Sequence, residues 1–478
     1  MRTKPIKLVA DLAPGERAFS VLMLAYLFLV TTTFWILKPL KKALFIQFYD
    51  DAGVTLLGWH LAAAEAELIA KLLNMVVAIA AVALFTWLAR RMRRHVLSIA
   101  FAGAFVLAFA LYAYILAHPG HLAVWSFYLF GDLFSTIMVG AFFAFLNDTV
   151  SPAAAKRLYG PIVAGGVAGG VFGTLVLSAW IERLTPPQWL GVSGGLGIAI
   201  GAVAFLAGRA VRALPPDSRS PDRPARPEAD PATRNPALEG AALVMRSRYL
   251  LAIVAIVGLY EIVSTVMDFQ FTSAVAHYFE GPAIGKHLSR VFAITNIVSL
   301  LVQVFVTGAV MSRLGVGAAL LVLPSTALAA SVAFLAAPTL WIGSLLNTAD
   351  NGFAYSINQS AKESLYTPTS TDEKYKAKAF IDMFVQRFAK TIGVVASLGM
   401  SRWFHDYASV RWLSLVSIAA IVVWASAARY AGRAFRERSE SGEPSKGQED
   451  ARSLPPRRNR EAHAVRGGRP AEAPLVLR

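Results

Sequence analysis

The chain is built around apolar runs that are each long enough to cross a lipid bilayer. A bilayer core of about 30 Å takes a helix of about 20 apolar residues. About twelve runs meet this length, and they begin near Ala18, Leu61, Val96, Leu122, Gly160, Trp189, Tyr249, Leu288, Gly315, Thr339, Phe380 and Trp412. Charged residues make up only 16% of the chain, against about 25% in soluble domains. The sequence therefore predicts an all-α, polytopic membrane protein with about twelve transmembrane helices.

The first run follows Arg2, Lys4, Lys7 and Arg17, as the core of a secretory signal peptide would. It is too long for such a core and lacks an A-x-A cleavage pattern, so we expect it to remain as the first span. The chain has no cysteine, which leaves no residue for a disulfide or a thiolate metal site.

The loops rich in Lys and Arg all fall on one side of the predicted bundle. They are Arg90–His95, Lys156 with Arg157, the segment Arg209–Arg248, Arg313, and Lys374 with Lys376 and Lys378. Such loops stay in the cytoplasm, so both termini are expected there. The net charge of +16 suits anionic lipid headgroups, and we expect no nucleic-acid partner.

A segment rich in Pro and Arg divides the spans into about six and six, the layout of two pseudo-symmetric halves. We expect a cytoplasmic N-terminal segment at 1–17, six-helix halves at 18–211 and 246–433, a linker at 212–245 and a tail at 434–478. Prolines oppose a helix through the linker. The tail mixes charges with Pro, Gly and Ser, which predicts disorder.

Several spans carry polar side chains on one helix face, which is the placement expected of residues that face a cavity. The stripes are Glu67, Lys71 and Asn74; Asp132 with Ser135 and Thr136; Glu261, Thr265, Asp268 and Thr272; Asn347, Asn351, Asn358 and Lys362, with Asp350 beside them; and Asp382 with Gln386, Arg387 and Lys390. Two simpler interpretations stay open. Glu67 and Lys71 can neutralise each other within one helix, and Ser or Thr stripes can serve helix packing.

The glycine-rich run Gly165–Gly173 has small residues at every fourth position, which favours close helix packing over a phosphate cradle. A G-x-x-x-x-G-K-[ST] motif, an H-E-x-x-H motif and a G-x-S-x-G motif do not occur. We therefore expect a protein that is not an enzyme and that carries no cofactor and no metal.

Three lysines, Lys38, Lys41 and Lys42, end the first apolar run around Pro39. Their ammonium groups can snorkel to lipid headgroups. The proline favours a different interpretation, because it frees a backbone carbonyl, which is tolerated where a cavity or a neighbouring helix satisfies it. An electropositive cavity mouth would attract an anion.

At these lysines the sequence resembles the nucleotide transporters of the ATP:ADP antiporter family, and the chain looks like a divergent bacterial member. Its I-L-K-P-L-K-K-A-L-F is similar to the family's I-L-R-x-x-K-D-T-L-V. The resemblance places Lys41 on the lysine that the family uses for transport, Lys38 on an arginine and Lys42 on an aspartate.

Two further stretches carry the resemblance. Residues 130–162 resemble the family's A-E-L-W-G-S…E-A-K-R-F-Y-P and put Asp132 in place of a functional glutamate. Residues 361–393 resemble its K-E-x-x-Y-x-P…K-A-x-I-D-V-x-x-x-R-x-G-K and match Lys362, Asp382, Arg387 and Lys390. In the seventh span a Glu-Trp-Lys stretch of the family is replaced by residues 265–271, where Asp268 offers a carboxylate.

The resemblance spans about Leu24 to Arg433 and implies a major-facilitator-like fold that exchanges ATP, ADP or similar phosphorylated anions by alternating access. The expected partners are that anion and membrane lipids, and we expect a monomer in the bacterial inner membrane. The expected substrate-binding residues are Lys38, Lys41, Lys71, Asp132, Asp268, Lys362, Asp382, Arg387 and Lys390.

Two other functions stay open. One is a proton-coupled carrier of another organic anion or a lipid, with Glu261 and Asp268 as the proton pair. The other is a membrane scaffold that binds partners through the linker and the tail.

Overall fold

The computed structural model describes residues 14–56, 58–219, 236–370, 373–403 and 406–441. The first half consists of α1 (Pro14–Phe48), the hairpin β1 (Val54–Leu56) and β2 (Trp59–Leu61), α2 (Ala63–Arg91), α3 (Arg94–Ile115), α4 (His121–Thr149), α5 (Pro152–Trp180) and α6 (Pro186–Ala210). The strands pair antiparallel, with Thr55 opposite His60. The short turns η1 (Val211–Ala213) and η2 (Pro216–Ser218) and the helix α7 (Pro236–Arg246) follow.

The second half contains helices that pass through π-helical turns. Its elements are α8 (Arg248–Tyr278), α9 (Pro282–Leu301), η3 (Val302–Thr307), α10 (Gly308–Arg313), α11 (Val316–Ala336), α12 (Leu340–Phe353), η4 (Ala354–Asn358), α13 (Gln359–Ser364), η5 (Glu373–Ala377), α14 (Lys378–Phe380), η6 (Ile381–Val385), α15 (Gln386–Trp403), η7 (Tyr407–Trp412) and α16 (Leu413–Ser441). The π-helical turns are η3, η4, η5 and η6.

Ten helices in the described part of the chain are long and apolar enough to cross a membrane. Two further helical rods, residues 340–364 and 373–403, complete the second half and are interrupted by π-helical turns. The described residues thus form about six spans on each side of the linker, and the predicted all-α polytopic fold is confirmed.

The helices begin where local chemistry favours a helix start. Pro152, Pro186 and Pro282 occupy the first turn of α5, α6 and α9, where the missing N–H costs no hydrogen bond. The hydroxyl groups of Ser151 and Ser247 accept the backbone N–H of Ala154 and Leu250 and cap α5 and α8.

Helical structure extends into two segments for which the sequence predicts a linker and disorder. Residues 236–246 form α7, which begins at a proline and so avoids an internal break. The helix α16 continues to Ser441, eight residues past the expected end of the second half at 433. The rest of the predicted tail, residues 442–478, and residues 220–235 of the linker lie outside the described residues, as do residues 1–13.

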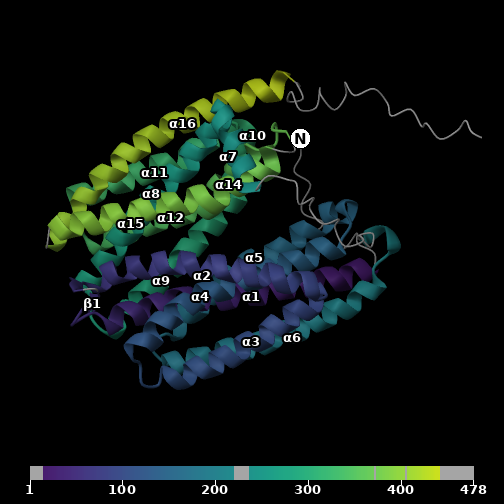
Figure 1. Ribbon diagram of the computed structural model, residues 1–478, viewed down its shortest axis with the longest axis horizontal. Helices are drawn as coiled ribbons and strands as arrows, with labels where there is room; N and C mark the ends of the chain where they lie inside the picture. Colours follow the sequence, from purple (N-terminus) through teal and green to yellow (C-terminus); the bar gives the residue numbers. More distant parts are fainter. Residues whose placement is uncertain (1–13, 57, 220–235, 371–372, 404–405, 442–478) are drawn as a thin grey trace, which may run out of the picture.

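Each half has its own apolar core, and two smaller clusters join the halves. One of these clusters brings Phe45, Tyr49 and Tyr128 of the first half against Phe271 and Phe292 of the second. The other packs Leu68 of α2 against Phe269 of α8 and Val394 of α15. Figure 1 shows the halves drawn together at the end that carries β1 and farther apart at the end where α1 begins.

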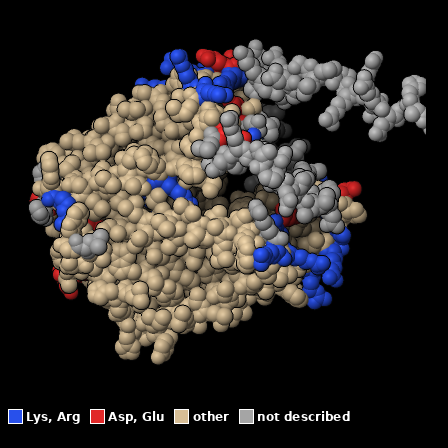
Figure 2. Space-filling view, viewed as in Figure 1, with Lys and Arg blue, Asp and Glu red and all other residues tan. Residues whose placement is uncertain are grey.

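The outer surface matches a bilayer. Large apolar side chains are exposed along the middle of the helices, as with Leu107, Val304 and Phe388. Trp59 in β2, Trp341 at the start of α12 and Trp403 at the end of α15 are exposed. Aromatic residues are enriched at such positions, where a membrane protein meets the membrane–water interface. Figure 2 shows Lys and Arg gathered at the right-hand end of both halves, the end where they separate.

The glycine run of α5 packs directly on the backbone of α1, as its spacing predicts. A Cβ atom on Gly165, Gly169 or Gly173 would lie 2.6, 2.3 or 2.6 Å from a backbone carbonyl oxygen of α1. The hydroxyl of Thr32 also donates to the carbonyl of Gly169 at 3.2 Å. This close backbone approach between α1 and α5, the α1–α5 seam, therefore holds the first and fifth spans together.

Substitution Gly169→Ala should weaken this seam, because a methyl group has no space against α1. We expect a loss of about 1–3 kcal/mol of stability, measured as a lower melting temperature of the detergent-purified protein. Gly160→Ala on the same helix is the matched control, since a Cβ there meets nothing within 4 Å. Equal melting temperatures for the two variants would contradict the packing assigned to the seam.

Candidate functional site

A cavity of about 490 Å³ lies between the two halves, and Figure 2 shows the surface hollowed there. Its charged lining consists of Lys38, Lys41, Lys42, Lys71, Lys362 and Lys390 together with Glu67, Asp132, Glu261, Asp268 and Asp350. Seven of the nine residues expected from the sequence are among them; Asp382 and Arg387 are not. In this lining six lysines face five carboxylates.

The lysines of α1 reach the cavity because they share one helix face. Lys41 and Lys42 follow Lys38 by three and four residues, and the three lysines lie in the last three turns of α1, which ends at Phe48. The helix passes through Pro39 without ending. Lys41 and Lys42 are both only 4% exposed, so these two lysines are held inside the protein and do not reach the lipid headgroups.

Lys41 is bound to the fourth span. Its Nζ lies 2.5 Å from Oδ1 of Asp132 and donates to the carbonyl of Tyr128 at 3.3 Å. The ring of Tyr128 lies 4.3 Å from the ammonium group, and Asn74 donates to the other oxygen of Asp132. Gly131 leaves the space for the lysine stem, since a Cβ there would lie 2.7 Å from Lys41 Cδ.

A second network crosses from one half to the other. Asp268 of α8 lies 2.8 Å from Lys42 Nζ and also pairs with Lys71. Glu67 accepts from Lys71 at 2.8 Å and from the hydroxyl of Tyr128 at 2.8 Å. The Glu67–Lys71 pair within α2 is therefore present, but it is one part of a bridge between the halves.

Lys38 has a different environment from the other lysines of α1. Its Nζ lies 4.7, 5.4 and 5.5 Å from the ring centres of Trp35, Phe292 and Tyr355, which is the range of cation–π attraction. Within the described part of the chain, neither Lys38 nor Lys362 or Lys390 makes an ion pair with a carboxylate.

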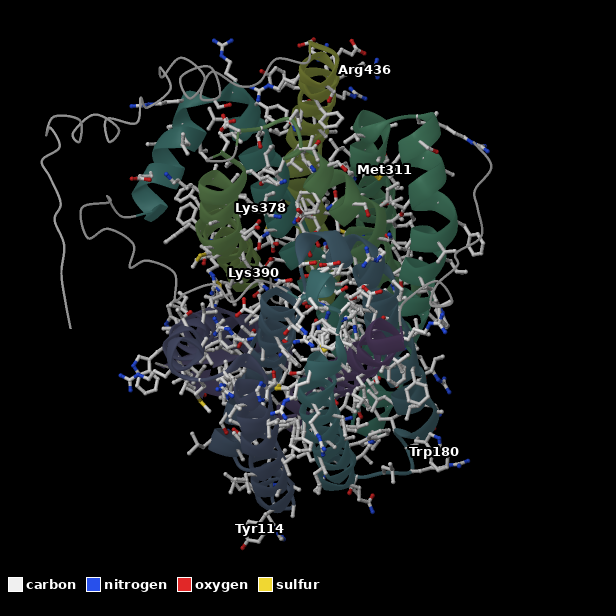
Figure 3. All side chains as sticks on the ribbon, turned by 90° about the vertical axis from the view of Figure 1, so that its right-hand side faces the viewer. Tyr114, Trp180, Met311, Lys378, Lys390 and Arg436 are labelled. Atoms are coloured by element: carbon white, nitrogen blue, oxygen red, sulfur yellow. The ribbon has the colours of Figure 1, made fainter. Side chains whose placement is uncertain are left out.

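The tenth span, formed by α12, η4 and α13, supplies a row of polar side chains to the cavity, here called the polar wall. Asn347, Asn351, Asn358 and Lys362 all line the cavity, as expected from their shared helix face. The amide of Asn351 donates to Oδ1 of Asn347 at 3.1 Å. Asp350 accepts from the hydroxyl of Ser264 at 2.6 Å. Figure 3 shows Lys390 at the boundary between the halves.

Two expected binding residues lie outside the cavity lining. Arg387 donates from Nη1 to the carbonyl of Met75 at 2.8 Å, a contact between α15 and α2. Asp382 accepts from Gln386 one turn along the same span, at 3.4 Å. Their binding role stays a prediction, while Arg387 has an observed contact between the two halves.

Sequence reasoning left Lys42 and the aromatic residues out of the site. The resemblance aligned Lys42 with an aspartate, although its place on the face of Lys38 marked it as a candidate. Tyr128, Tyr260 and Tyr355 line the cavity, but an aromatic residue in an apolar span has no pattern that separates a cavity position from a packed one.

Comparison with known proteins agrees with this arrangement. The model of the family "TLC ATP/ADP transporter" matches residues 228–340 and 336–435. The ADP,ATP carrier protein 2 of Chlamydia trachomatis is 24% identical over 428 residues, covering 75% of this chain and 79% of the carrier. The chain is thus similar to the TLC ATP/ADP transporter family in its second half and to an ADP,ATP carrier over most of its length. It is a transporter and not an enzyme.

A plant relative is similar over a smaller share of its own length. The chloroplastic ADP,ATP carrier protein 1 of Arabidopsis thaliana is 23% identical, and the match covers 70% of this chain and 58% of the carrier.

Solved structures share the fold. A nucleoside transporter NupG variant superposes with a TM-score of 0.59 at 14% identity, covering 86% of this chain and 99% of its own. A bacterial homologue of the human lysosomal transporter Spinster superposes with a TM-score of 0.57 at 13% identity. The match covers 90% of this chain and 99% of the homologue. The expected major-facilitator-like fold is thus confirmed for this chain.

Removal of one carboxylate from the bridging network should be costly, because the buried Lys42 and Lys71 would then share the single carboxylate of Asp268. We expect Glu67→Gln to lower stability by about 3 kcal/mol, measured as a drop in melting temperature. Asp148→Asn is the matched control, since Asp148 pairs with Arg94 at the surface with its side chain 53% exposed, where a pair contributes about 0–1 kcal/mol. An unchanged melting temperature in Glu67→Gln would contradict the network.

Proposed function

We propose that the protein exchanges ATP, ADP or similar phosphorylated anions across the membrane by alternating access. The observation that carries this proposal is the set of three cavity lysines, Lys38, Lys362 and Lys390, that make no ion pair among the described residues. Ammonium groups in a partly dehydrated cavity attract an anion strongly, and a phosphate offers several oxygens to several donors. The names of the relatives, ADP,ATP carrier proteins, support a nucleotide.

The paired lysines would act in the same site. A phosphate can compete with Asp132 for Lys41, and with Asp268 for Lys42 and Lys71, because each carboxylate is held only by charge and hydrogen bonds. Loss of the Asp268 contacts would release a bridge between the halves. An empty site would keep that bridge, so reorientation would require an anion, which is the requirement for exchange.

The packing supports an inward-facing arrangement. The apolar clusters that join the halves lie beside β1, and the halves separate at the end where α1 begins (Figure 1). The basic residues gather at that end (Figure 2), which supports a cytoplasmic location for it. We further propose a location in the bacterial inner membrane, both termini in the cytoplasm, anionic lipid at the basic end, and function as a monomer.

Single cysteines test this orientation on a chain with no native cysteine. Ser439→Cys, exposed at the end of α16, should be protected from an impermeant thiol reagent in intact cells and labelled after the cells are opened. Ala52→Cys, exposed at the opposite end, should be labelled in intact cells. The reverse pattern would place the basic end outside.

The substitution Lys38→Gln tests phosphate binding without leaving a carboxylate unpaired. We expect a loss of about ten- to a hundred-fold in apparent affinity for ADP, measured as uptake of labelled ADP into proteoliposomes loaded with ATP. Uptake should require the internal nucleotide, and affinity should fall as salt is added.

Lys286→Gln serves as the control for that experiment. Lys286 pairs with Glu182 at 2.7 Å and does not line the cavity, so this variant should keep the affinity of the parent protein. If ADP uptake does not depend on internal nucleotide, or if Lys38→Gln matches Lys286→Gln, exchange through these lysines is wrong.

A proton-coupled carrier of another organic anion or a lipid is the second candidate. Of the expected proton pair, Glu261 lines the cavity and makes no ion pair within the described residues, whereas Asp268 pairs with Lys42 and Lys71. Asp350, which also lines the cavity without an ion pair among the described residues, would take the place of Asp268. Such a carrier would accumulate its substrate under an imposed pH gradient in proteoliposomes without internal nucleotide. An exchanger would show no accumulation under that condition.

A further inference from the structure

The hairpin of β1 and β2 occupies a fixed position at the closed end of the molecule, the end where Figure 1 shows the halves drawn together. It follows α1 and leads into α2. Gly53, at a φ of 56°, begins it, and a Cβ there would lie 2.5 Å from the carbonyl oxygen of Leu61, so a glycine is needed where the ends of the hairpin meet. Val54 and Leu61 are buried in an apolar cluster that joins the halves.

The first half holds the base of the hairpin through a chain of hydrogen bonds. The hydroxyl of Tyr49, in the turn after α1, accepts from Nε1 of Trp125 at 2.8 Å. The same hydroxyl lies 3.0 Å from Nδ1 of His121. Both partners belong to α4, so the end of α1 is tied to the start of α4. The hairpin therefore moves with the first half.

The second half contacts the hairpin through Arg402 in the last turn of α15. Its Nη2 donates to the carbonyl of His60 at 3.1 Å. Its guanidinium carbon lies 5.0 Å from the ring centre of Trp59, which is the range of cation–π attraction. Arg402 and His60 are 342 residues apart in the chain, and the contact joins the two halves at the surface.

A neighbouring carboxylate strengthens this contact. Glu65, in the first turn of α2, accepts the backbone N–H of Ala62 with Oε2 at 2.9 Å, which fixes its orientation. Its other oxygen accepts from the hydroxyl of Ser401. Two successive residues at the end of α15 thus bind two points of the first half, on either side of the junction between β2 and α2.

We infer that Arg402 is a positioning residue that holds the closed end shut by binding the hairpin, and that this contact breaks in every transport cycle. When the closed end opens, the hairpin moves with the first half and α15 with the second, so the hydrogen bond and the ring contact are lost. The contact therefore sets the share of molecules that are open at this end. The inference rests on the proposed alternating access and not on the identity of the anion.

A single cysteine in place of Ala64 reports the opening. Ala64 is only 5% exposed and packs with Leu68 and Phe269 in the second cluster that joins the halves, so a thiol there is reached when the closed end opens. The chain has no native cysteine. The measurement is the rate of reaction with a polar thiol reagent in lipid nanodiscs, where both faces of the protein meet the reagent.

In the Ala64→Cys background, Arg402→Ala should react about three- to ten-fold faster, as expected for the loss of a surface hydrogen bond that favours the closed arrangement. Arg402→Lys keeps a charge and a donor, so its rate should lie between those of Arg402→Ala and the parent. A parent rate in Arg402→Ala would overturn the inference. Absence of reaction in every variant, also with ADP present, would show that this end does not open, and alternating access would fail with it.

Arg183→Ala is the matched control. The guanidinium carbon of Arg183 lies 4.9 Å from the ring centre of Trp180, in the connection between α5 and α6, so the same kind of contact is present within one half. Its reaction rate should equal that of the parent. Equal acceleration by Arg183→Ala and Arg402→Ala would mean general loosening and would contradict a role for the hairpin contact.

Uptake kinetics in intact cells separate a shifted equilibrium from simple damage. A larger share of outward-open protein lowers the apparent KM for external ADP, so Arg402→Ala should lower this KM by a factor similar to its gain in reaction rate. Damage to the fold would raise the KM or lower the maximal rate instead. If ADP is taken up and the KM is unchanged or raised, the assignment of Arg402 is wrong and exchange stands. If the parent takes up no ADP, the proposed substrate fails and the cysteine rates decide the role of Arg402.

Discussion

The charge bridge between the halves, in which Asp268 of α8 contacts Lys42 of α1 and Lys71 of α2, is the interaction on which the rest of the structure depends. Charges in a membrane interior are costly unless they are paired or face water. The bridge satisfies both conditions, since it lines a cavity and neutralises two lysines with one carboxylate from the other half and with Glu67. It ties the electrostatics of the site to the relative position of the halves.

The arrangement of the apolar contacts gives this bridge a mechanical consequence. Clusters around Phe45 and Phe271, and around Leu68 and Phe269, join the halves beside the hairpin. The hydrogen bond from Arg387 of α15 to the carbonyl of Met75 in α2 is a further contact between the halves. Within each half, close seams such as that of Gly169 on α1 keep the helices together. The halves are thus suited to move as units about the bridge, and an anion that competes for its lysines would change the balance between arrangements.

Much of this fold could be predicted from the sequence because the bilayer imposes a simple rule of length and polarity. Span positions and the stripe from Asn347 to Lys362 follow from apolar runs and helical spacing, which are local properties. The partners of each charge do not follow, since Asp268 and Lys42 are 226 residues apart and only the packing of the halves brings them together. Arg387 shows the same limit: its position in a matching stretch predicts substrate contact, which stays a prediction, and no local pattern indicated its hydrogen bond to the carbonyl of Met75 in the other half. The π-helical turn η4, the helix α7 and the extension of α16 to Ser441 are also set by packing and left no distinct pattern in the sequence.

The central claim is that a phosphorylated anion, by neutralising the cavity lysines, allows the halves to change their relative position. The most direct measurement is the distance between spin labels on the separated ends, at Gly160→Cys in the first half and Thr367→Cys in the second, both exposed positions, in protein reconstituted in lipid. Addition of ADP should shift the distance distribution toward shorter values as the ends approach, and adenosine at the same concentration should leave it unchanged. An equal shift with adenosine, or no shift with ADP at saturating concentration, would contradict the claim that phosphate charge controls the change.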